Sequence, residues 1–192
     1  MSNYVVWSTQ VVPHCFVLDE LEGVDLDVEL RMGRPCANAF PSKAVYTVDP
    51  EFPNNIGLAD AFYNSNRLAL ASENLKDFVA AWNPSDVEYL PVTLLNHKSR
   101  PAGKYFILHP VNPVDALKPK ESGAKWSKEN NQRIEKVSKL VLDENKIDRS
   151  RLLFKLKYFY KCVLIRRDLA EAITAKGFTG LQWTECAKYR PL

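Results

Sequence analysis

Long apolar runs are missing from this sequence. No stretch approaches the roughly 20 consecutive apolar residues that a membrane-spanning helix requires, so the sequence predicts no membrane association. The first 17 residues have no basic region at their start, and polar residues such as Ser8, Thr9 and Gln10 interrupt the apolar ones. This pattern argues against a secretory signal peptide. We therefore expect a cytoplasmic protein.

Cysteine and histidine are also scarce. Four cysteines lie far apart and form no C-x-x-C pair: Cys15, Cys36, Cys162 and Cys186. Among the three histidines only His14 is close in sequence to one of them, whereas His97 and His109 are not. This spacing fits neither a zinc site nor a redox motif. We expect reduced, partly buried thiols, no bound metal and no other cofactor, and the sequence brings no Cys–His pair together.

The common catalytic motifs are absent as well. The chain has no G-x-G-x-x-G, no Walker loop, no H-E-x-x-H, no G-x-S-x-G and no kinase signature. No residue can therefore be named as catalytic. The sequence favours a protein that is not an enzyme and that acts by binding another macromolecule.

What the chain does contain is the composition of an ordinary globular protein. With 192 residues, 46% of them hydrophobic, it can form a core without disulfides or metal ions. Its length fits one α+β domain, with two packed subdomains as the alternative. The candidate boundary is the loop 112–131, which is rich in Pro, Lys, Ser, Gly and Asn. Trp126 inside this loop predicts that the loop is anchored rather than a flexible linker.

Hydrophobic periodicity predicts several strands. Residues 26–32 alternate strictly between apolar and polar side chains, and residues 45–48 form a shorter candidate strand. Residues 87–95 and 104–109 read as two strands of a hairpin joined by a polar loop. The aromatic and β-branched residues of 152–165 predict one long strand. The periodicity of 134–142 suits a helix or a strand and does not decide between them.

Two short helices accompany these strands. Ser72 is placed as an N-cap before Leu75, Phe78, Val79 and Trp82, which follow the spacing of one helix face, and Asn83-Pro84 ends that helix. A second helix is predicted over 168–175, with Gly177 after its end. The predicted fold class is therefore α+β, with a mixed, mainly antiparallel sheet and a few short covering helices.

The net charge of +3 conceals an uneven distribution. Residues 1–60 carry three Lys/Arg against nine Asp/Glu, so this part of the chain is strongly acidic. Six of the carboxylates form a run without an intervening base: Asp19, Glu20, Glu22, Asp25, Asp27 and Glu29. On the predicted strand, the last three would project from one face. Either they are a solvated strand face, which is the common case, or they bind a cationic partner.

A basic and aromatic stretch lies in the second half of the chain. Its basic residues are Arg149, Arg151, Lys155, Lys157, Lys161, Arg166 and Arg167, and Phe154, Tyr158, Phe159 and Tyr160 lie between them. Basic residues with aromatic neighbours on a strand are typical of single-stranded nucleic-acid binding. The same alternation is typical of an edge strand that uses lysines against aggregation. With the modest overall charge, the edge strand is favoured, and a nucleic-acid partner bound by the last five of these bases is the alternative.

Four short segments carry a family resemblance. They are Arg67-Leu-Ala-Leu-Ala-Ser72-Glu-Asn-Leu75, Asp86-Val-Glu-Tyr-Leu-Pro91-Val, Tyr105-Phe-Ile-Leu-His-Pro110-Val-Asn-Pro-Val-Asp115 and Lys176-Gly-Phe-Thr-Gly180-Leu-Gln-Trp183. In these segments the chain resembles a family of bacterial polymorphic-toxin immunity proteins, the one numbered eleven and formerly called a domain of unknown function. The resemblance implies that the protein binds a cognate toxin in the cytoplasm and blocks it. It implies no binding residues and no oligomeric state.

Overall fold

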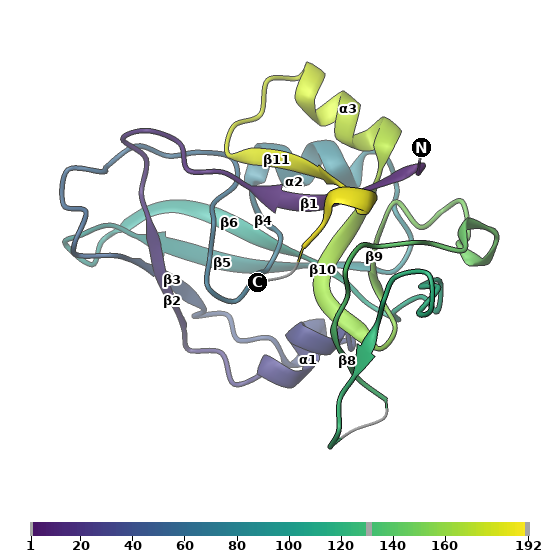
Figure 1. Ribbon diagram of the computed structural model, residues 1–192. Helices are drawn as coiled ribbons and strands as arrows, with labels where there is room; N and C mark the ends of the chain where they lie inside the picture. The colour runs from purple at the N-terminus through teal and green to yellow at the C-terminus, as the bar shows by residue number, and fades with distance from the viewer. Residues whose placement is uncertain (1, 130–131, 191–192) are drawn as a thin grey trace.

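Two main sheets, a two-stranded ribbon and three short α-helices make up the fold (Figure 1). The computed structural model describes residues 2–129 and 132–190. Within these ranges, all strand pairs except β3–β5 are antiparallel. The predicted α+β class with a mainly antiparallel sheet and short helices is confirmed. In the described part of the chain, no helix is long and apolar enough to cross a membrane.

The larger sheet has five strands in the order β2-β3-β5-β6-β4. Their bounds are Leu18–Glu22 (β2), Val45–Val48 (β3), Val87–Leu95 (β5), Pro101–Pro110 (β6) and Leu70–Ser72 (β4). The predicted strand at 45–48 and the predicted hairpin at 87–109 are both present. The hairpin turn is tighter than predicted, because the Asn96 side chain accepts hydrogen bonds from the backbone N–H groups of Lys98 and Arg100.

The second sheet has four strands in the order β11-β1-β10-β9. Their bounds are Leu181–Glu185 (β11), Tyr4–Thr9 (β1), Phe159–Arg166 (β10) and Leu153–Leu156 (β9). Strand β1, near the start of the chain, pairs with β10 on one side and β11 on the other. This sheet therefore joins residues from both ends of the sequence.

The single long strand predicted at 152–165 is wrong, because the chain reverses between β9 and β10. Phe159 pairs with Leu156 across a two-residue turn, in which Tyr158 has a φ of 68°. A bulky residue rarely adopts this left-handed conformation. Its neighbours hold it there: the Tyr158 carbonyl accepts a hydrogen bond from the Ile134 N–H at 2.7 Å, and its ring packs on Trp126. No Gly or Asn marks this turn in the sequence.

The strand predicted at 26–32 is also wrong, because residues Asp27–Met32 form the helix α1. Leu26 and Leu30, one helical turn apart, pack into the core, whereas Val28 is 42% exposed. Gly33 ends the helix in the left-handed conformation (φ 67°), and its N–H donates to the Glu29 carbonyl. An alternating pattern over so few residues also fits about one and a half turns of helix. Gly33, directly after the pattern, favours the helix because glycine commonly ends helices.

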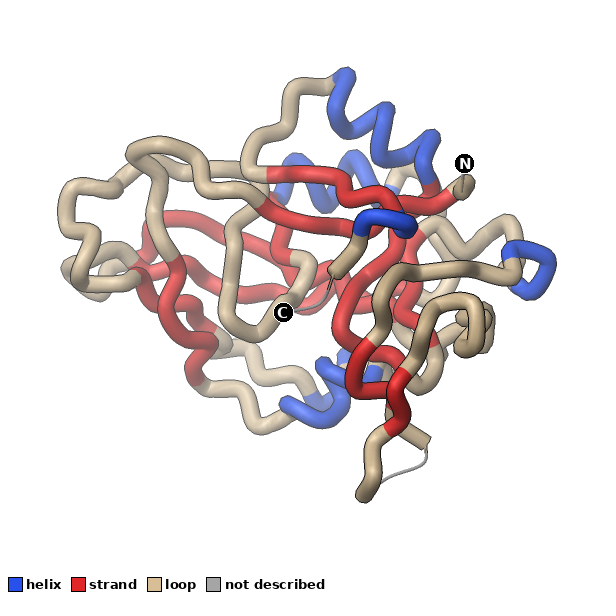
Figure 2. The backbone as a smooth tube through the Cα atoms, in the orientation of Figure 1, coloured by secondary structure: helices blue, strands red, loops and turns tan. Residues whose placement is uncertain are grey.

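The two longer helices form where they were predicted. Helix α2 (Glu73–Ala80) begins at Ser72, whose side chain accepts a hydrogen bond from the Leu75 N–H, and α3 spans Arg167–Ala175. Both helices contribute to one hydrophobic cluster, α2 with Leu75 and α3 with Leu169. Figure 2 shows α2 and α3 near the top of the view and α1 near the bottom, so helices lie on two opposite sides of the strands.

The segment from 111 to 152 contains little regular structure. Its strands are β7 (Lys125–Trp126) and β8 (Ile134–Lys136), which pair with each other. It also contains one of the three 3₁₀ turns of the described residues, Glu144–Lys146 (η2); the other two are Ala37–Ala39 (η1) and Cys186–Lys188 (η3). The open question at 134–142 is answered by the short strand β8. Residues 130 and 131 of the predicted loop 112–131 lie outside the described residues. The choice between one domain and two packed subdomains stays a prediction.

Candidate functional site

A cleft of about 730 Å³ opens between α1, the segment 65–68, the segment 132–134 and the strands β9 and β10. Three buried apolar side chains, Leu30, Leu68 and Ile134, line it. A smaller hollow of about 240 Å³ adjoins it and shares Arg67, Leu68 and Lys161 with it. The segments that build this site are far apart in the sequence.

Positive charge dominates the cleft. Its charged lining residues are five bases and one acid: Arg31, Arg67, Arg133, Lys155, Lys161 and Asp27. Within residues 2–129 and 132–190, four of these bases take part in no ion pair: Arg31, Arg67, Arg133 and Lys161. Arg31, Arg67 and Arg133 are exposed, and Lys161 is half-buried. Their charges are therefore free to attract an anionic group.

Lys155 is the buried member of this group, and its role is structural. Its side chain is only 4% exposed, and its ammonium group donates hydrogen bonds to the carbonyl oxygens of Leu30 (2.6 Å) and Arg31 (3.1 Å). These carbonyls belong to the last turn of α1, where the helix leaves acceptors without partners and carries partial negative charge. Burial lowers the pKa of Lys155 to about 8. Lys155 thus fixes α1 against β9.

Gly33 allows this close contact between α1 and its surroundings. A Cβ atom at this position would lie 2.9 Å from the Pro110 carbonyl oxygen, 3.1 Å from Pro113 and 3.5 Å from the Lys155 side chain. The carbonyl of Gly33 also accepts a hydrogen bond from the Asn112 N–H at 3.0 Å. The position of α1 at the cleft is therefore set by backbone contacts as well as by Lys155.

The six acidic residues predicted as a partner-binding face do not share a face. Asp19, Glu20 and Glu22 are exposed on β2, which is an edge strand of the five-stranded sheet. Asp25 lies in the following loop, and Asp27 and Glu29 lie in the first turn of α1, where carboxylates are favourable. Of the six, only Asp27 lines the cleft. The strand face assumed for residues 25–29 does not exist, because Asp25 lies in a loop and the helix α1 begins at Asp27.

The five basic residues proposed for nucleic-acid binding are likewise separated. Lys155 and Lys161 come together at the cleft, whereas the exposed Lys157 lies in the β9–β10 turn over the Tyr158 ring. Arg166 pairs with Asp168, and Arg167 makes two hydrogen bonds of 2.8 Å to the Glu185 carboxylate. Strand β9 is last in the order of its sheet, as predicted. It is not an open edge guarded by lysines, because Lys155 is buried and Val114 makes backbone hydrogen bonds with Lys155 and Lys157 on the outer side of the strand.

Sequence reasoning missed three bases of the cleft: Arg31, Arg67 and Arg133. Each stands alone in the sequence, and no local pattern marks any of them as part of a site. Arg67 has a left-handed backbone conformation (φ 56°), which is unusual for arginine, but this feature is visible only in the structure.

The thiols do not provide a nucleophile among the described residues. All four cysteines are unpaired, as predicted, and Cys36, Cys162 and Cys186 are buried. Burial raises the pKa of Cys36 to about 11, that of Cys162 to about 12 and that of Cys186 to about 11. A nucleophilic cysteine needs a lowered pKa, so these thiols are unsuited to that role.

Comparison with protein families supplies the context for this geometry. The model of an immunity protein family (Imm11) matches residues 14–188 of the chain. This range includes every charged residue that lines the larger cleft. A search of curated proteins found no match.

Proposed function

Because the chain belongs to the Imm11 immunity protein family, we propose that it neutralises a cognate bacterial toxin by binding it in the cytoplasm. The inhibition is stoichiometric, so one immunity protein occupies one toxin, and no chemical step is required of the immunity protein. The family match carries this proposal. The missing catalytic motifs and the raised pKa values of the buried thiols support the non-enzymatic part.

The toxin-binding surface in this proposal is the basic cleft. An acidic segment of the toxin fits its chemistry, because Arg31, Arg67 and Lys161 have no carboxylate partner within the part of the chain that the structure describes. Charges of one sign raise the association rate of an oppositely charged partner and orient it before contact. The cleft would therefore determine both the association rate and the orientation of the bound toxin.

Exposed apolar and aromatic side chains add contact area beside these charges. Val28, at the larger cleft, is 42% exposed, and Tyr63, at the smaller hollow, is 61% exposed. Most of the binding energy of an interface comes from a few such side chains, with the polar rim adding specificity. The cleft and the adjoining hollow thus combine positive charges that attract the toxin with two exposed side chains, Val28 and Tyr63, that the toxin would bury.

Co-expression tests the function directly. A candidate toxin gene from the same locus would be expressed with and without the immunity protein, and growth and copurification would be measured. We expect growth to be restored and a complex of fixed stoichiometry to copurify. Toxicity that persists in the presence of the folded protein, with no complex, would refute the proposal.

A second measurement separates this function from nucleic-acid binding. The isolated protein would be mixed with single-stranded DNA and RNA at low salt, where contacts with phosphates are strongest. We expect at most weak binding, because, of the five residues predicted to contact nucleic acid, Lys155 is buried and Arg166 and Arg167 are already paired. Binding that weakens steeply with salt would favour the nucleic-acid alternative instead.

A further inference from the structure

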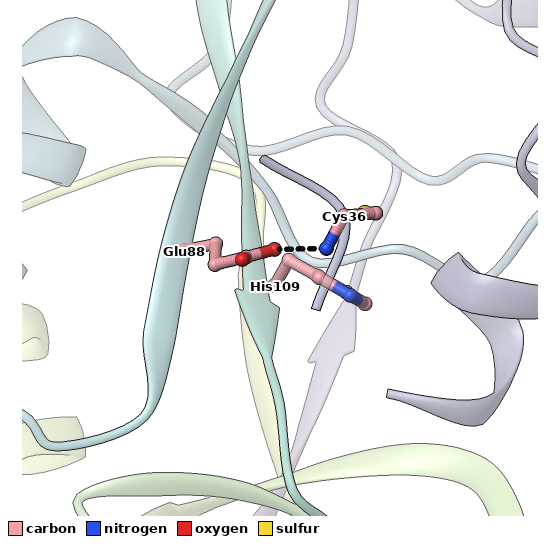
Figure 3. A group of neighbouring side chains, drawn as sticks. All are labelled: Cys36, Glu88 and His109. Carbon is pink, nitrogen blue, oxygen red and sulfur yellow. Dashed lines mark hydrogen bonds between the residues drawn. The ribbon is translucent and has the colours of Figure 1, made fainter. Parts of the chain in front are cut away.

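Three side chains with different metal-ligating atoms meet where η1 approaches the five-stranded sheet (Figure 3). His109 on β6 and Glu88 on β5 are directly opposed partners in the antiparallel register, and Cys36 immediately precedes η1. One ligand atom of each residue lies within 4.8 Å of those of the other two. Sequence spacing gave no sign of this group, because its members come from three separate elements.

His109 contributes an unused nitrogen. The residue is 1% exposed, and its Nε2 atom lies 2.9 Å from the carbonyl oxygen of Arg34, to which it donates a hydrogen bond. Because Nε2 is the donor of this hydrogen bond, Nδ1 keeps the free lone pair in the neutral form of the ring. Nδ1 is buried and has no hydrogen-bond partner. Such orphaned acceptors are rare in folded proteins and call for a partner, such as a water molecule or a metal ion.

The hydrogen bond to Arg34 has a second consequence. Metal-ligating histidines commonly donate their other ring N–H to a carboxylate or a backbone carbonyl, which fixes the tautomer and the orientation of the ring. The Arg34 carbonyl fills this role for His109. The ring is therefore held in the tautomer that a metal ion requires.

Glu88 and Cys36 are held in place in a comparable way. One carboxylate oxygen of Glu88 accepts hydrogen bonds from the N–H groups of Cys36 (2.9 Å) and Ala37 (3.1 Å). The Cys36 sulfur and a carboxylate oxygen of Glu88 lie within 4.8 Å of one another. Glu88 is half-buried and Ala37 is exposed.

We propose that Cys36, Glu88 and His109 form a zinc-binding site. Sulfur, imidazole nitrogen and carboxylate oxygen are the three ligand types that zinc uses in proteins, whereas magnesium and calcium prefer oxygen alone. Binding replaces the proton of the Cys36 thiol by the ion, and the proton passes to solvent. Thiolate and carboxylate then balance the two positive charges, and the fourth tetrahedral position accepts a small ligand such as water.

The distances require only a modest contraction. An ion equally far from three atoms that are 4.8 Å apart would lie about 2.8 Å from each, compared with about 2.0–2.3 Å for zinc–nitrogen and zinc–sulfur bonds. Each ligand must therefore move inward by about half an ångström or somewhat more. Cys36 belongs to a short loop segment, which absorbs such a shift more easily than β5 or β6.

The ion would bind segment 34–39 to the five-stranded sheet. This segment follows α1 directly, and α1 forms one wall of the basic cleft. Zinc would therefore help to hold α1, and with it one wall of the cleft, in place without binding in the cleft itself. The proposal does not depend on toxin binding.

Cobalt(II) provides the test, because its absorption spectrum reports sulfur ligation. Purified protein would be freed of metal with a chelator and titrated with cobalt(II), then with zinc(II). We expect one equivalent of cobalt to give a thiolate-to-cobalt charge-transfer band that zinc abolishes. Cys36→Ser should remove the band. His109→Gln and Glu88→Gln should each weaken binding more than about tenfold, since even outer-shell partners are worth about 10- to 100-fold.

The matched controls are Cys15→Ser and His97→Gln, which remove the same side-chain types elsewhere. Both should retain the wild-type spectrum and affinity. If Cys36→Ser fails to fold, loss of cobalt affinity in His109→Gln and Glu88→Gln still identifies the site, and unchanged affinity in both overturns the proposal. A spectrum without the charge-transfer band overturns the proposal, and so does a band that survives in folded Cys36→Ser.

Discussion

The ammonium group of Lys155 donates a hydrogen bond of 2.6 Å to the carbonyl oxygen of Leu30, across 125 positions of the sequence. This contact attaches the end of α1 to the edge strand β9. It also joins the acidic first part of the chain to its basic second part, at one wall of the cleft. A buried ammonium of this kind makes stability depend on pH.

Replacing Lys155 by Met tests that dependence. Burial lowers the pKa of Lys155 from 10.5 to about 8, so between these values the unfolded chain holds a proton that the folded protein does not. Raising the pH through this window should therefore stabilise the wild type relative to Lys155→Met, by at most about 3 kcal/mol. Below about pH 8 the difference should be constant. Denaturant unfolding of both proteins across the window measures it.

The exposed Lys157→Met serves as the control for that comparison, because its pKa is raised by the neighbouring Tyr158 and gives no gain with pH. If the wild type and Lys155→Met keep a constant difference through the window, the lowered pKa is refuted.

Gly180 should tolerate no side chain. A Cβ atom there would lie 1.9 Å from the Ala61 carbonyl oxygen, and its φ is 81°. Gly177 has a similar φ of 77° but has nothing within 4 Å of its added Cβ. Gly177→Ala should therefore cost about 1–2 kcal/mol from backbone strain alone, and Gly180→Ala more than about 3 kcal/mol. Equal costs in equilibrium unfolding would show that the clash is relieved cheaply.

Ser72→Ala should destabilise α2 by about 1 kcal/mol, as expected for the loss of an N-cap. The Ser72 hydroxyl accepts from the Leu75 N–H at 3.2 Å and donates to Asp60 at 2.8 Å. Asp60 in turn accepts from the backbone and side chain of Thr179, so the loss also loosens the segment before β11. Thermal unfolding measures the cost. The exposed Ser65→Ala is the control and should change the free energy of unfolding by less than about 0.5 kcal/mol.

Charge reversal distinguishes the two candidate interfaces with the toxin. Arg31→Glu with Lys161→Glu should weaken binding at least about tenfold, or ~1.4 kcal/mol, chiefly through slower association at low salt. Asp19→Lys with Glu20→Lys reverses the same number of charges on β2 and should leave the affinity nearly unchanged. Surface plasmon resonance at two salt concentrations measures both rates. Weakening by the β2 pair alone would move the interface to the acidic run.

Local signals in the sequence predicted the elements that local chemistry determines. Ser72 and the apolar spacing after it located α2, and the polar residues after Leu95 located the β5–β6 hairpin. The turn at Tyr158 was missed because tertiary contacts with Ile134 and Trp126, not turn residues, hold it. At α1 the sequence carries two conflicting signals, since the alternation over 26–32 predicts a strand and Gly33 directly after it suits the end of a helix.

The sites could not be read from the sequence for a related reason. Arg31, Arg67 and Lys161 share a cleft only because α1, the segment before β4 and β10 converge on it. Cys36, Glu88 and His109 meet only because of the strand register that sets Glu88 opposite His109. Neither arrangement has a spacing that repeats or a motif that marks it.

The central position of β1 bears on how the molecule is made. Val5 pairs with Ile165 on one side and with Glu185 on the other, so β1 finds its partners only after the segments that contain these two residues have been synthesised. Contacts between residues so distant in sequence form slowly, because a large loop must close first. During synthesis the apolar residues of β1 therefore remain without their native neighbours. The interval before protection from a toxin begins would be governed by the closing of this sheet.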